Sequence, residues 1–211
     1  MANVNKVIKY AILRGVGFDL QKAKECCDFI NEEPVEMDEA KRRDGIYLIY
    51  HNGEVKPYAK GCSKENVRYI GVVHNGHSFA LALNDITDVA LLPDGKKAGK
   101  RKRLDRECDA IYDFNSAKNT EALSEDNPAL RDVLNEGEAI PALGVLNIIA
   151  HLRDEINEAL GYIGGQELKD TWYWSSTESS LYDAWTVYFS DGYTYLNSKC
   201  IAYAVRAVAA F

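Results

Sequence analysis

The sequence predicts a mixed α+β fold, in which helices and strands occupy separate stretches of the chain. Three observations lead to this prediction. Apolar residues recur at helical spacing in some stretches, they alternate as in strands in others, and the order is helix, strands, helices, strands. With 211 residues and 46% hydrophobic content, the chain can bury a core without disulfides or a metal.

The first stretch, residues 4–31, is predicted to be helical. Leu20, Ala23 and Ile30 recur at a spacing of three to four residues, and a Glu-Glu-Pro sequence then ends the pattern. We therefore assign residues 1–43 to an N-terminal helical segment, and we expect it to serve in attachment or assembly.

Residues 45–92 have strand character. Two Asn-Gly pairs, at 52–53 and 75–76, are strong hairpin signals because this dipeptide accepts the backbone of tight turns. The strands expected beside these turns are 46–50, 69–73 and 78–83.

The charge of the chain is unevenly distributed. Residues 96–106 carry seven basic side chains and one acidic one, whereas the rest of the chain carries 18 basic and 31 acidic side chains. An acidic body argues against a dedicated nucleic-acid-binding protein. We interpret the basic run as a solvated loop and expect a loop over residues 93–104. Contact of the run with phosphate or an anionic surface is the alternative.

Helical character returns in the middle of the chain. The stretches expected to be helical are 105–118, 128–135 and 146–163. In the last of them an apolar stripe predicts one face packed on the core, with Pro141 just before the helix and Gly161, Gly164 and Gly165 after its end.

The tail of the chain, residues 171–211, is predicted to be β-rich and is unusually aromatic. It holds 11 of the 22 aromatic residues but five charged ones. Trp185, Val187 and Phe189 alternate, which places them on one inward face, so Thr186 and Tyr188 are expected to point away from the core.

The composition of residues 173–203 favours a contact surface. Tyr, Ser, Asn, Asp and Gly dominate there, as in antibody paratopes, where Tyr gives rigid contact area and the small polar residues give adaptable hydrogen bonds. A Tyr-rich solvated sheet without a ligand is the alternative. The residues expected to contact a ligand are Tyr182, Asp183, Thr186, Tyr188, Ser190, Asp191, Tyr193, Tyr195, Leu196, Asn197, Ser198, Ile201 and Ala202. The residues expected to hold the fold are Trp174, Trp185, Val187, Phe189, Val205 and Val208.

Several segments of the tail resemble a known family. They are Tyr173-Trp174-Ser175-Ser176-Thr177-Glu178, Ala184-Trp185 with Val187 and Phe189, Gly192, Lys199, and Val205-Arg206-Ala207-Val208. Together they are similar to the C-terminal signature of C-type-lectin-fold proteins of the formylglycine-generating-enzyme-like subtype. They look especially like the variable proteins of diversity-generating retroelements. The likeness is strong over 171–211 and softer over the rest of 44–211.

This resemblance implies a C-type-lectin-like ligand-binding domain over residues 44–211, with a variable-type region at about 171–211. Such proteins display receptor-binding tips on bacteriophage tails or on cell surfaces. The partner implied is a cell-surface protein or glycan receptor, and the implied assembly is a homo-oligomer such as a trimer. The resemblance also implies that scaffold residues hold the fold while diversified residues line the binding face.

We expect neither a metal nor a cofactor nor enzymatic activity. The sugar-binding motifs Glu-Pro-Asn and Trp-Asn-Asp of the calcium-dependent lectins are absent. The oxidases of the subtype use a cysteine pair in the C-terminal region, and this tail has Cys200 alone. His74 and His77 flank an Asn-Gly turn, which explains them better than a metal pair does. An oxidase of this type, or a structural virion or surface protein, remains the alternative.

The remaining expectations concern the location of the protein. The N-terminus shows no signal peptide, and no apolar run is long enough to cross a membrane. The five cysteines, an odd number, suit reduced thiols. We therefore expect a protein made in the bacterial cytoplasm that ends in a virion as part of a phage tail, or else at the cell surface.

Overall fold

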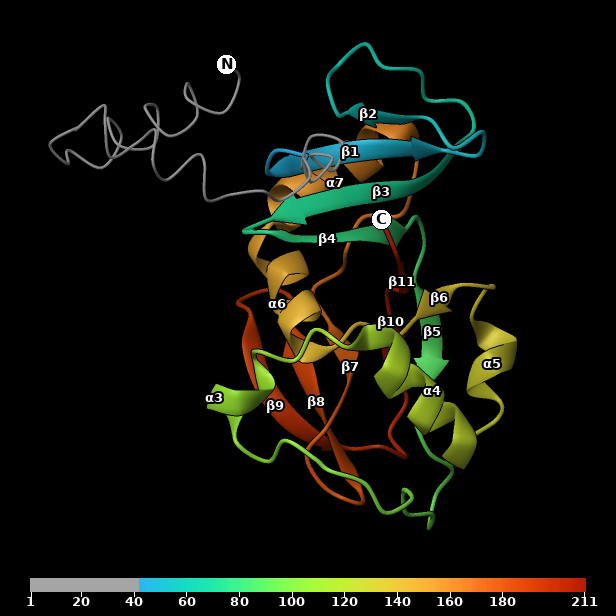
Figure 1. Ribbon diagram of the computed structural model, residues 1–211, viewed down its shortest axis with the longest axis vertical. Coiled ribbons are helices and arrows are strands. Elements are labelled where there is room, and N and C mark those ends of the chain that lie inside the picture. Colours follow the sequence, from blue (N-terminus) through green and yellow to red (C-terminus); the bar gives the residue numbers. More distant parts are fainter. Residues whose placement is uncertain (1–41) are drawn as a thin grey trace, which may run out of the picture. The chain divides into compact units, whose positions relative to one another are not determined.

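The α+β class is confirmed by the computed structural model, which describes residues 42–211. This part of the chain forms two sheets and five helices (Figure 1). The helix predicted over residues 4–31 lies outside the described residues.

The first sheet has six strands in the order β2-β1-β3-β4-β11-β6. All five of its pairings are antiparallel, and the hairpins of β1 with β2 and of β3 with β4 form at the two predicted Asn-Gly turns. At the second turn Asn75 and Gly76 have φ values of 49° and 81°, a left-handed pair that suits Asn-Gly. The strand bounds are β1 Gly45–Tyr50, β2 Val55–Pro57, β3 Val67–His74, β4 His77–Ala82, β6 Glu138–Ala139 and β11 Val208–Ala209.

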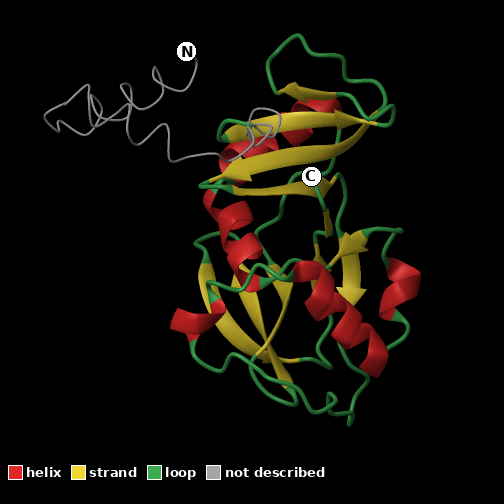
Figure 2. Cartoon of the chain, viewed as in Figure 1, coloured by secondary structure: helices red, strands yellow, loops and turns green. Residues whose placement is uncertain are grey.

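The second sheet has five strands in the order β5-β10-β7-β8-β9. The predicted strand at 204–209 is divided, because β10 joins this sheet while β11 joins the first. The strand bounds are β5 Ile86–Val89, β7 Trp172–Glu178, β8 Asp183–Tyr188, β9 Tyr193–Ser198 and β10 Tyr203–Val205. Figure 2 shows the strands of both sheets and the helices, coloured by secondary structure.

The helices correct two predictions about length. The helix expected at 105–118 is instead a short helix followed by a longer one, because a turn around Asp113 separates them. The helix expected at 146–163 starts three residues earlier and is interrupted at Leu152, and Gly161 lies inside it rather than after its end. The helix bounds are α3 Glu107–Ala110, α4 Ser116–Asp126, α5 Leu130–Val133, α6 Leu143–His151 and α7 Arg153–Ile163.

A large core joins the two sheets through α6 and α7. Leu146 and Ile149 of α6 pack with Leu81 of the first sheet and with Trp185 and Val187 of the second. The predicted apolar stripe of 146–163 therefore does face the core. A second, smaller cluster lies on the other side of the second sheet.

A buried ion pair ties the last strands to the middle of the chain. Arg206, which lies between β10 and β11, donates from Nε to Asp85 Oδ1 over 2.7 Å, and both side chains are fully buried. Its other nitrogens donate to the carbonyl oxygens of Ala82 and Gln166, while the Tyr173 hydroxyl donates to Asp85 Oδ2. Each of the three guanidinium nitrogens thus donates a hydrogen bond, which ties the segment between β10 and β11 to residues 82–85 and 166.

Candidate functional site

The tail presents a set of aromatic side chains on one side of the second sheet. Trp172, Tyr188, Tyr193, Tyr195 and Tyr203 come from four neighbouring strands, and we call them the aromatic face. The strand register brings them together, because Trp172 pairs with Tyr188, and Tyr188 pairs with Tyr193. Residues that are paired across strands lie on the same face of a sheet.

Trp172 is the centre of the aromatic face. Its ring centroid lies 5.1 Å from that of Tyr188, 6.3 Å from that of Tyr195 and 6.4 Å from that of Tyr203. Tyr193 stacks on Tyr195 with centroids 6.1 Å apart. Tyr193 and Tyr195 are 59% and 52% exposed, whereas the other three rings are half-buried. The result is a rigid aromatic layer with its outer edge open to solvent.

Polar side chains next to this layer fix the backbone of β9. The Thr186 hydroxyl donates to the Tyr195 carbonyl oxygen over 3.1 Å and accepts from Asn197 Nδ2 over 2.8 Å. Asn197 in turn accepts a hydrogen bond from the Tyr203 hydroxyl. The aromatic face therefore rests on a connected hydrogen-bond network that spans β8, β9 and β10.

Thr186, one of the residues predicted to contact a ligand, has a fully buried side chain. Thr186 does point away from Val187, as the alternation predicts. However, it pairs with Trp174 on that side of the sheet, where Trp174 belongs to the second hydrophobic cluster. Alternation identified the face correctly, but only part of that face is open to solvent.

The other predicted contact residues differ in exposure. Eight are exposed: Tyr182, Ser190, Asp191, Tyr193, Tyr195, Leu196, Ile201 and Ala202. Four are half-buried: Asp183, Tyr188, Asn197 and Ser198. Three of these twelve, Tyr188, Tyr193 and Tyr195, belong to the aromatic face.

Strand geometry divides the predicted contact residues between the two faces of the sheet. Along β9, Tyr193, Tyr195 and Asn197 lie on the aromatic side, while Leu196 and Ser198 lie on the opposite side. Leu196 is the register partner of the core residue Trp185. One flat partner cannot contact both sets at once.

Trp172 and Tyr203 are members of the aromatic face that the sequence prediction missed. Their signal was present in the pattern: each lies two residues from a buried scaffold residue, Trp174 or Val205, and so shares its side of the sheet. The predicted scaffold residues Trp174, Trp185, Val187, Phe189, Val205 and Val208 are all buried.

The basic run is a loop, as predicted, but the side chains of Arg101 and Arg103 are only 21% and 11% exposed. Arg101 forms an ion pair with Glu178 of β7 and a second one, of 2.6 Å, with Asp126 of α4. Lys199 is fully buried and contacts the same glutamate over 2.6 Å. Burial lowers the pKa of Lys199 below its ordinary value, and the hydrogen bond and charge of Glu178 oppose that shift. Glu178 is therefore a scaffold residue, as the sequence suggested.

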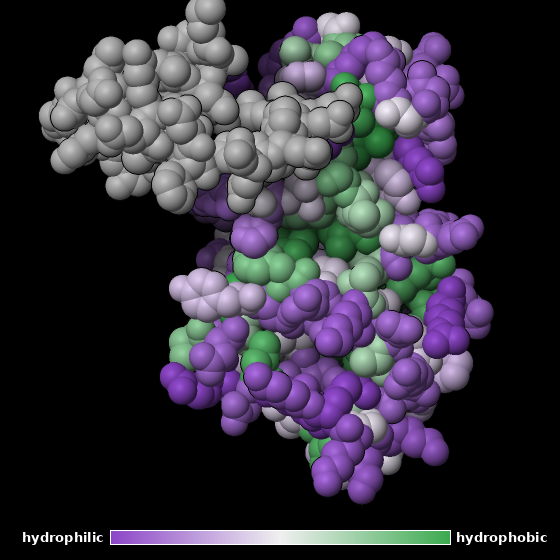
Figure 3. Space-filling view, viewed as in Figure 1, coloured by the Kyte–Doolittle hydropathy of each residue, from purple (hydrophilic) through white to green (hydrophobic). Residues whose placement is uncertain are grey.

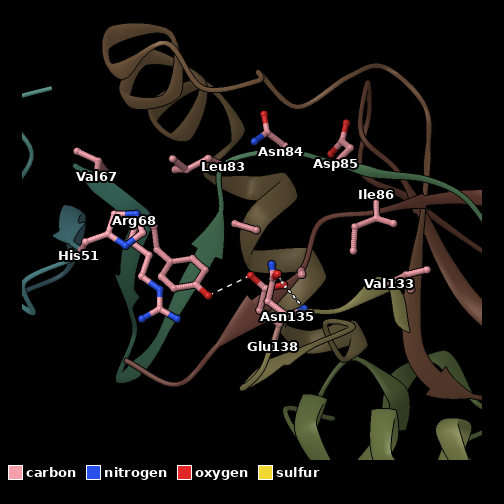
Figure 4. A pocket seen from close by; sticks show the side chains of 13 residues that line it. His51, Val67, Arg68, Leu83, Asn84, Asp85, Ile86, Val133, Asn135 and Glu138 are labelled. Atoms are coloured by element: carbon pink, nitrogen blue, oxygen red, sulfur yellow. Dashed lines mark hydrogen bonds between the residues drawn. The ribbon is translucent and has the colours of Figure 1, made fainter. Parts of the chain in front are cut away.

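A separate hollow of about 540 Å³ lies between β3, the 82–86 segment and the α5–β6 connection (Figure 4). On its wall the Tyr69 hydroxyl donates to Glu138 over 3.0 Å, and Asn135 donates to the other oxygen of the same carboxylate. His51 and Arg68 complete one side of it. Both carboxylate oxygens of Glu138 therefore accept hydrogen bonds within this wall.

The described residues contain no group of three or more His, Cys, Asp or Glu side chains arranged to hold a metal ion. The cysteines of this part of the chain, Cys62, Cys108 and Cys200, are all free thiols. Among the described helices, none is both long and apolar enough to cross a bilayer.

Comparison with known proteins gives a likeness of fold. No protein-family model and no curated protein sequence matches the chain. The crystal structure of a fimbrial protein from Bacteroides ovatus ATCC 8483 is similar, with a TM-score of 0.61 and 15% sequence identity. The match covers 81% of this chain and 49% of the fimbrial protein, so the chain spans about half the length of that structure. At this identity the likeness shows a shared fold.

Proposed function

We propose that this chain is a binding protein that presents the aromatic face to a receptor, as an adhesin at a cell surface or a phage tail does. The observation that supports this function best is the ring layer around Trp172, in which Tyr193 and Tyr195 remain more than half exposed. Exposed tyrosines that cluster on a sheet leave apolar surface in contact with water, which is unfavourable when the sheet has a purely structural role. The same cluster suits the centre of an interface, where that surface is buried by a partner.

The geometry also suits a macromolecular partner. The aromatic face is a sheet surface supported by a hydrogen-bond network, so little conformational entropy is lost when it binds. The protein that shares the fold is named as a fimbrial protein, which is consistent with an adhesive role for this chain. The receptor class proposed is a cell-surface protein or a glycan.

The test is a binding measurement with intact bacterial cells and with an array of purified surface glycans. Tyr193→Ala and Tyr195→Ala should each weaken binding by about 30-fold, because truncating an aromatic residue at the centre of an interface removes about 2 kcal/mol. Both variants should unfold at nearly the wild-type temperature, because these side chains are exposed.

Two control variants separate binding from folding. Tyr112→Ala removes a tyrosine that is 75% exposed outside the aromatic face, and it should bind normally. Trp185→Ala removes a core ring and should destabilise the fold by about 3–5 kcal/mol. The proposal fails if the double Tyr193/Tyr195 variant binds every cell and glycan ligand of the wild-type protein with unchanged affinity.

A finer proposal is that the chain is the variable protein of a diversity-generating retroelement with a C-type-lectin-like fold. It rests on the resemblance over residues 171–211 and on the kinds of residue at the exposed positions there. The coding DNA tests it: a nearby reverse transcriptase gene and a template repeat that differs at adenines are expected. A tail without such a repeat would exclude diversification and leave the binding function to be judged by the variants above.

A further inference from the structure

A second cavity, of about 410 Å³, lies between the 101–104 loop, α4 and β7, and we call it the basic cavity. Its charged lining comprises four cations, Arg101, Lys102, Arg103 and Lys118, and two carboxylates, Asp113 and Glu178. The lining therefore carries two more positive than negative charges, although the net charge of the whole chain is −7. Figure 3 shows strongly hydrophilic side chains gathered over the region where this loop and α4 run.

The two carboxylates of the basic cavity are already engaged by the protein. Asp113 accepts hydrogen bonds from the side chains of Asn115, Asn119 and Thr177. Glu178 forms ion pairs with Arg101, with Lys199 and, over 3.6 Å, with Arg103 Nη2. Their oxygens are thus unavailable to the lysines at the opening of the cavity.

The arginines, by contrast, have hydrogen-bonding capacity left. Arg103 donates to the carbonyl oxygens of Gly99 and Arg101 through its two terminal nitrogens, over 2.6 and 3.0 Å. Its Nε, together with Arg101 Nη2, is buried and has no hydrogen-bond partner among the described residues. The same holds for the hydroxyl of Ser176, a cavity-lining residue that is 1% exposed. Buried donors without an acceptor are unfavourable, so this wall is incomplete in hydrogen-bonding terms.

The opening of the cavity carries two more cations. Lys102 and Lys118 are exposed, and within residues 42–211 neither has an ion-pair partner. Lys118 lies in the first turn of the 11-residue helix α4, a turn without acidic side chains. The positive end of the helix dipole therefore adds to the charge of the lysines.

From this arrangement we propose that the basic cavity binds a phosphate or sulfate group. Arg103 Nε and Arg101 Nη2 supply guanidinium donors for a tetrahedral oxyanion, and the exposed lysines supply charge at the opening. The volume of the cavity lies in the range of small-molecule sites and exceeds what a bare anion fills. The ligand class is therefore an oxyanion carried on a small, sugar-sized molecule. This site is separate from the aromatic face, so the proposal does not depend on the proposed receptor binding.

Isothermal titration calorimetry on the full chain tests the proposal with four probes: inorganic phosphate, inorganic sulfate, glucose 6-phosphate and glucose 6-sulfate. Both esters are expected to bind more tightly than the free anions, and glucose alone should not bind. Tighter binding of the free anions would overturn the sugar-sized ligand, and absence of binding by all four probes would overturn the site.

Charge variants locate the site. Lys102→Gln and Lys118→Gln should each weaken binding about threefold, and the double variant about tenfold, as for partly exposed charge pairs. Lys97→Gln is the matched control, because Lys97 belongs to the same basic run but does not line the cavity. An equal loss with Lys97→Gln would show diffuse attraction to the run and would refute a defined site.

Two further variants probe the wall without removing charge. Arg103→Lys keeps the positive charge but lacks Nε, so it should lower the affinity for the phosphate ester. Ser176→Ala removes a hydroxyl that has no partner in this part of the chain, so the melting temperature without ligand should not fall, while the ligand-induced rise should shrink. Unchanged ligand responses in both variants would contradict the assigned wall.

Discussion

Tyr173 shows how a single buried hydroxyl links stability to pH. It donates to Asp85 Oδ2 over 3.0 Å and accepts from the backbone N–H of Lys169 over 3.0 Å. Burial, with the nearby Asp85 charge and hydrogen bond, raises the pKa of Tyr173 from 10.0 to about 12. The folded state therefore holds this proton over a range in which the unfolded chain releases it.

The sign of the resulting pH dependence follows from that direction. The contribution of Tyr173 is fully present below about pH 10 and is lost as the pH rises towards 12. Denaturant unfolding at a series of alkaline pH values should show the free energy of unfolding falling over this range. In Tyr173→Phe the fall should be shallower, although the variant starts from a lower value because it lacks the hydrogen bonds. Tyr112→Phe, at an exposed position, is the control, and an identical slope in all three proteins would rule out this role for Tyr173.

Residue roles were predictable from the sequence where alternation decides burial, and less so elsewhere. Trp185, Val187 and Phe189 are buried as their spacing predicted. The burial of Thr186 was not predicted, because its exposure depends on which residues cover the second face of the sheet. The pattern of a single strand contains no information about those residues. Trp172 was missed for the complementary reason, since its neighbours in space come from three other strands.

At the level of elements, α6 and α7 contain glycines in opposite environments. A Cβ at Gly144 of α6 would lie 2.8 Å from the carbonyl oxygens of Asp113 and Ile111, which are fixed backbone atoms. A Cβ at Gly161 of α7 would meet the end of the Glu167 side chain at 3.0 Å, and that side chain can move. The first helix thus starts in direct contact with the loop before α4.

We expect Gly144→Ala to destabilise the protein by about 1–3 kcal/mol, the usual effect of overpacking a close contact. Gly161→Ala should instead stabilise it by up to about 1 kcal/mol, since alanine favours the helix more than glycine does. Urea unfolding of both variants beside the wild type measures this difference. If Gly144→Ala were as stable as the wild type, the close approach of α6 to residues 111–113 would be incorrect.

The elements themselves were predicted with uneven success. The hairpins at 52–53 and 75–76 form as expected, because local turn chemistry specifies them. The long helix was predicted without its break at Leu152, and the division of 204–209 between two sheets was not predicted. Both features depend on contacts with distant segments rather than on local spacing.

At the scale of the whole molecule, residues Arg43–Phe211 form one unit with continuous hydrophobic clusters. We therefore predict that a fragment of residues 43–211 folds by itself and unfolds in one cooperative transition, as domains of this size commonly do. Circular dichroism during heating, compared with the full chain, measures this. A broad, non-cooperative melt of the fragment would show that residues 1–42 are needed for folding.

The fold class could be predicted from the order of helical and strand patterns, and the aromatic character of the tail from its composition. The basic cavity could not be predicted in this way. It requires the 101–104 loop to lie against β7, and the pairing of Arg101 with Glu178, 77 residues along the chain, is invisible to local patterns. The basic run is evident from the number of charges in the sequence. Its acidic partners Asp126 and Glu178, which hold the loop against α4 and β7, are not.

The ion pair of Arg206 with Asp85 has a consequence for biosynthesis. The two residues are 121 positions apart, and the strands on either side of Arg206 fill places in both sheets. While the ribosome is still translating the intervening sequence, β4 and β7 each lack a neighbour, and the Asp85 carboxylate has no counterion. Neither sheet can therefore complete its strand order before residues 203–209 are synthesised, and until then each sheet has an open strand edge of the kind that favours aggregation.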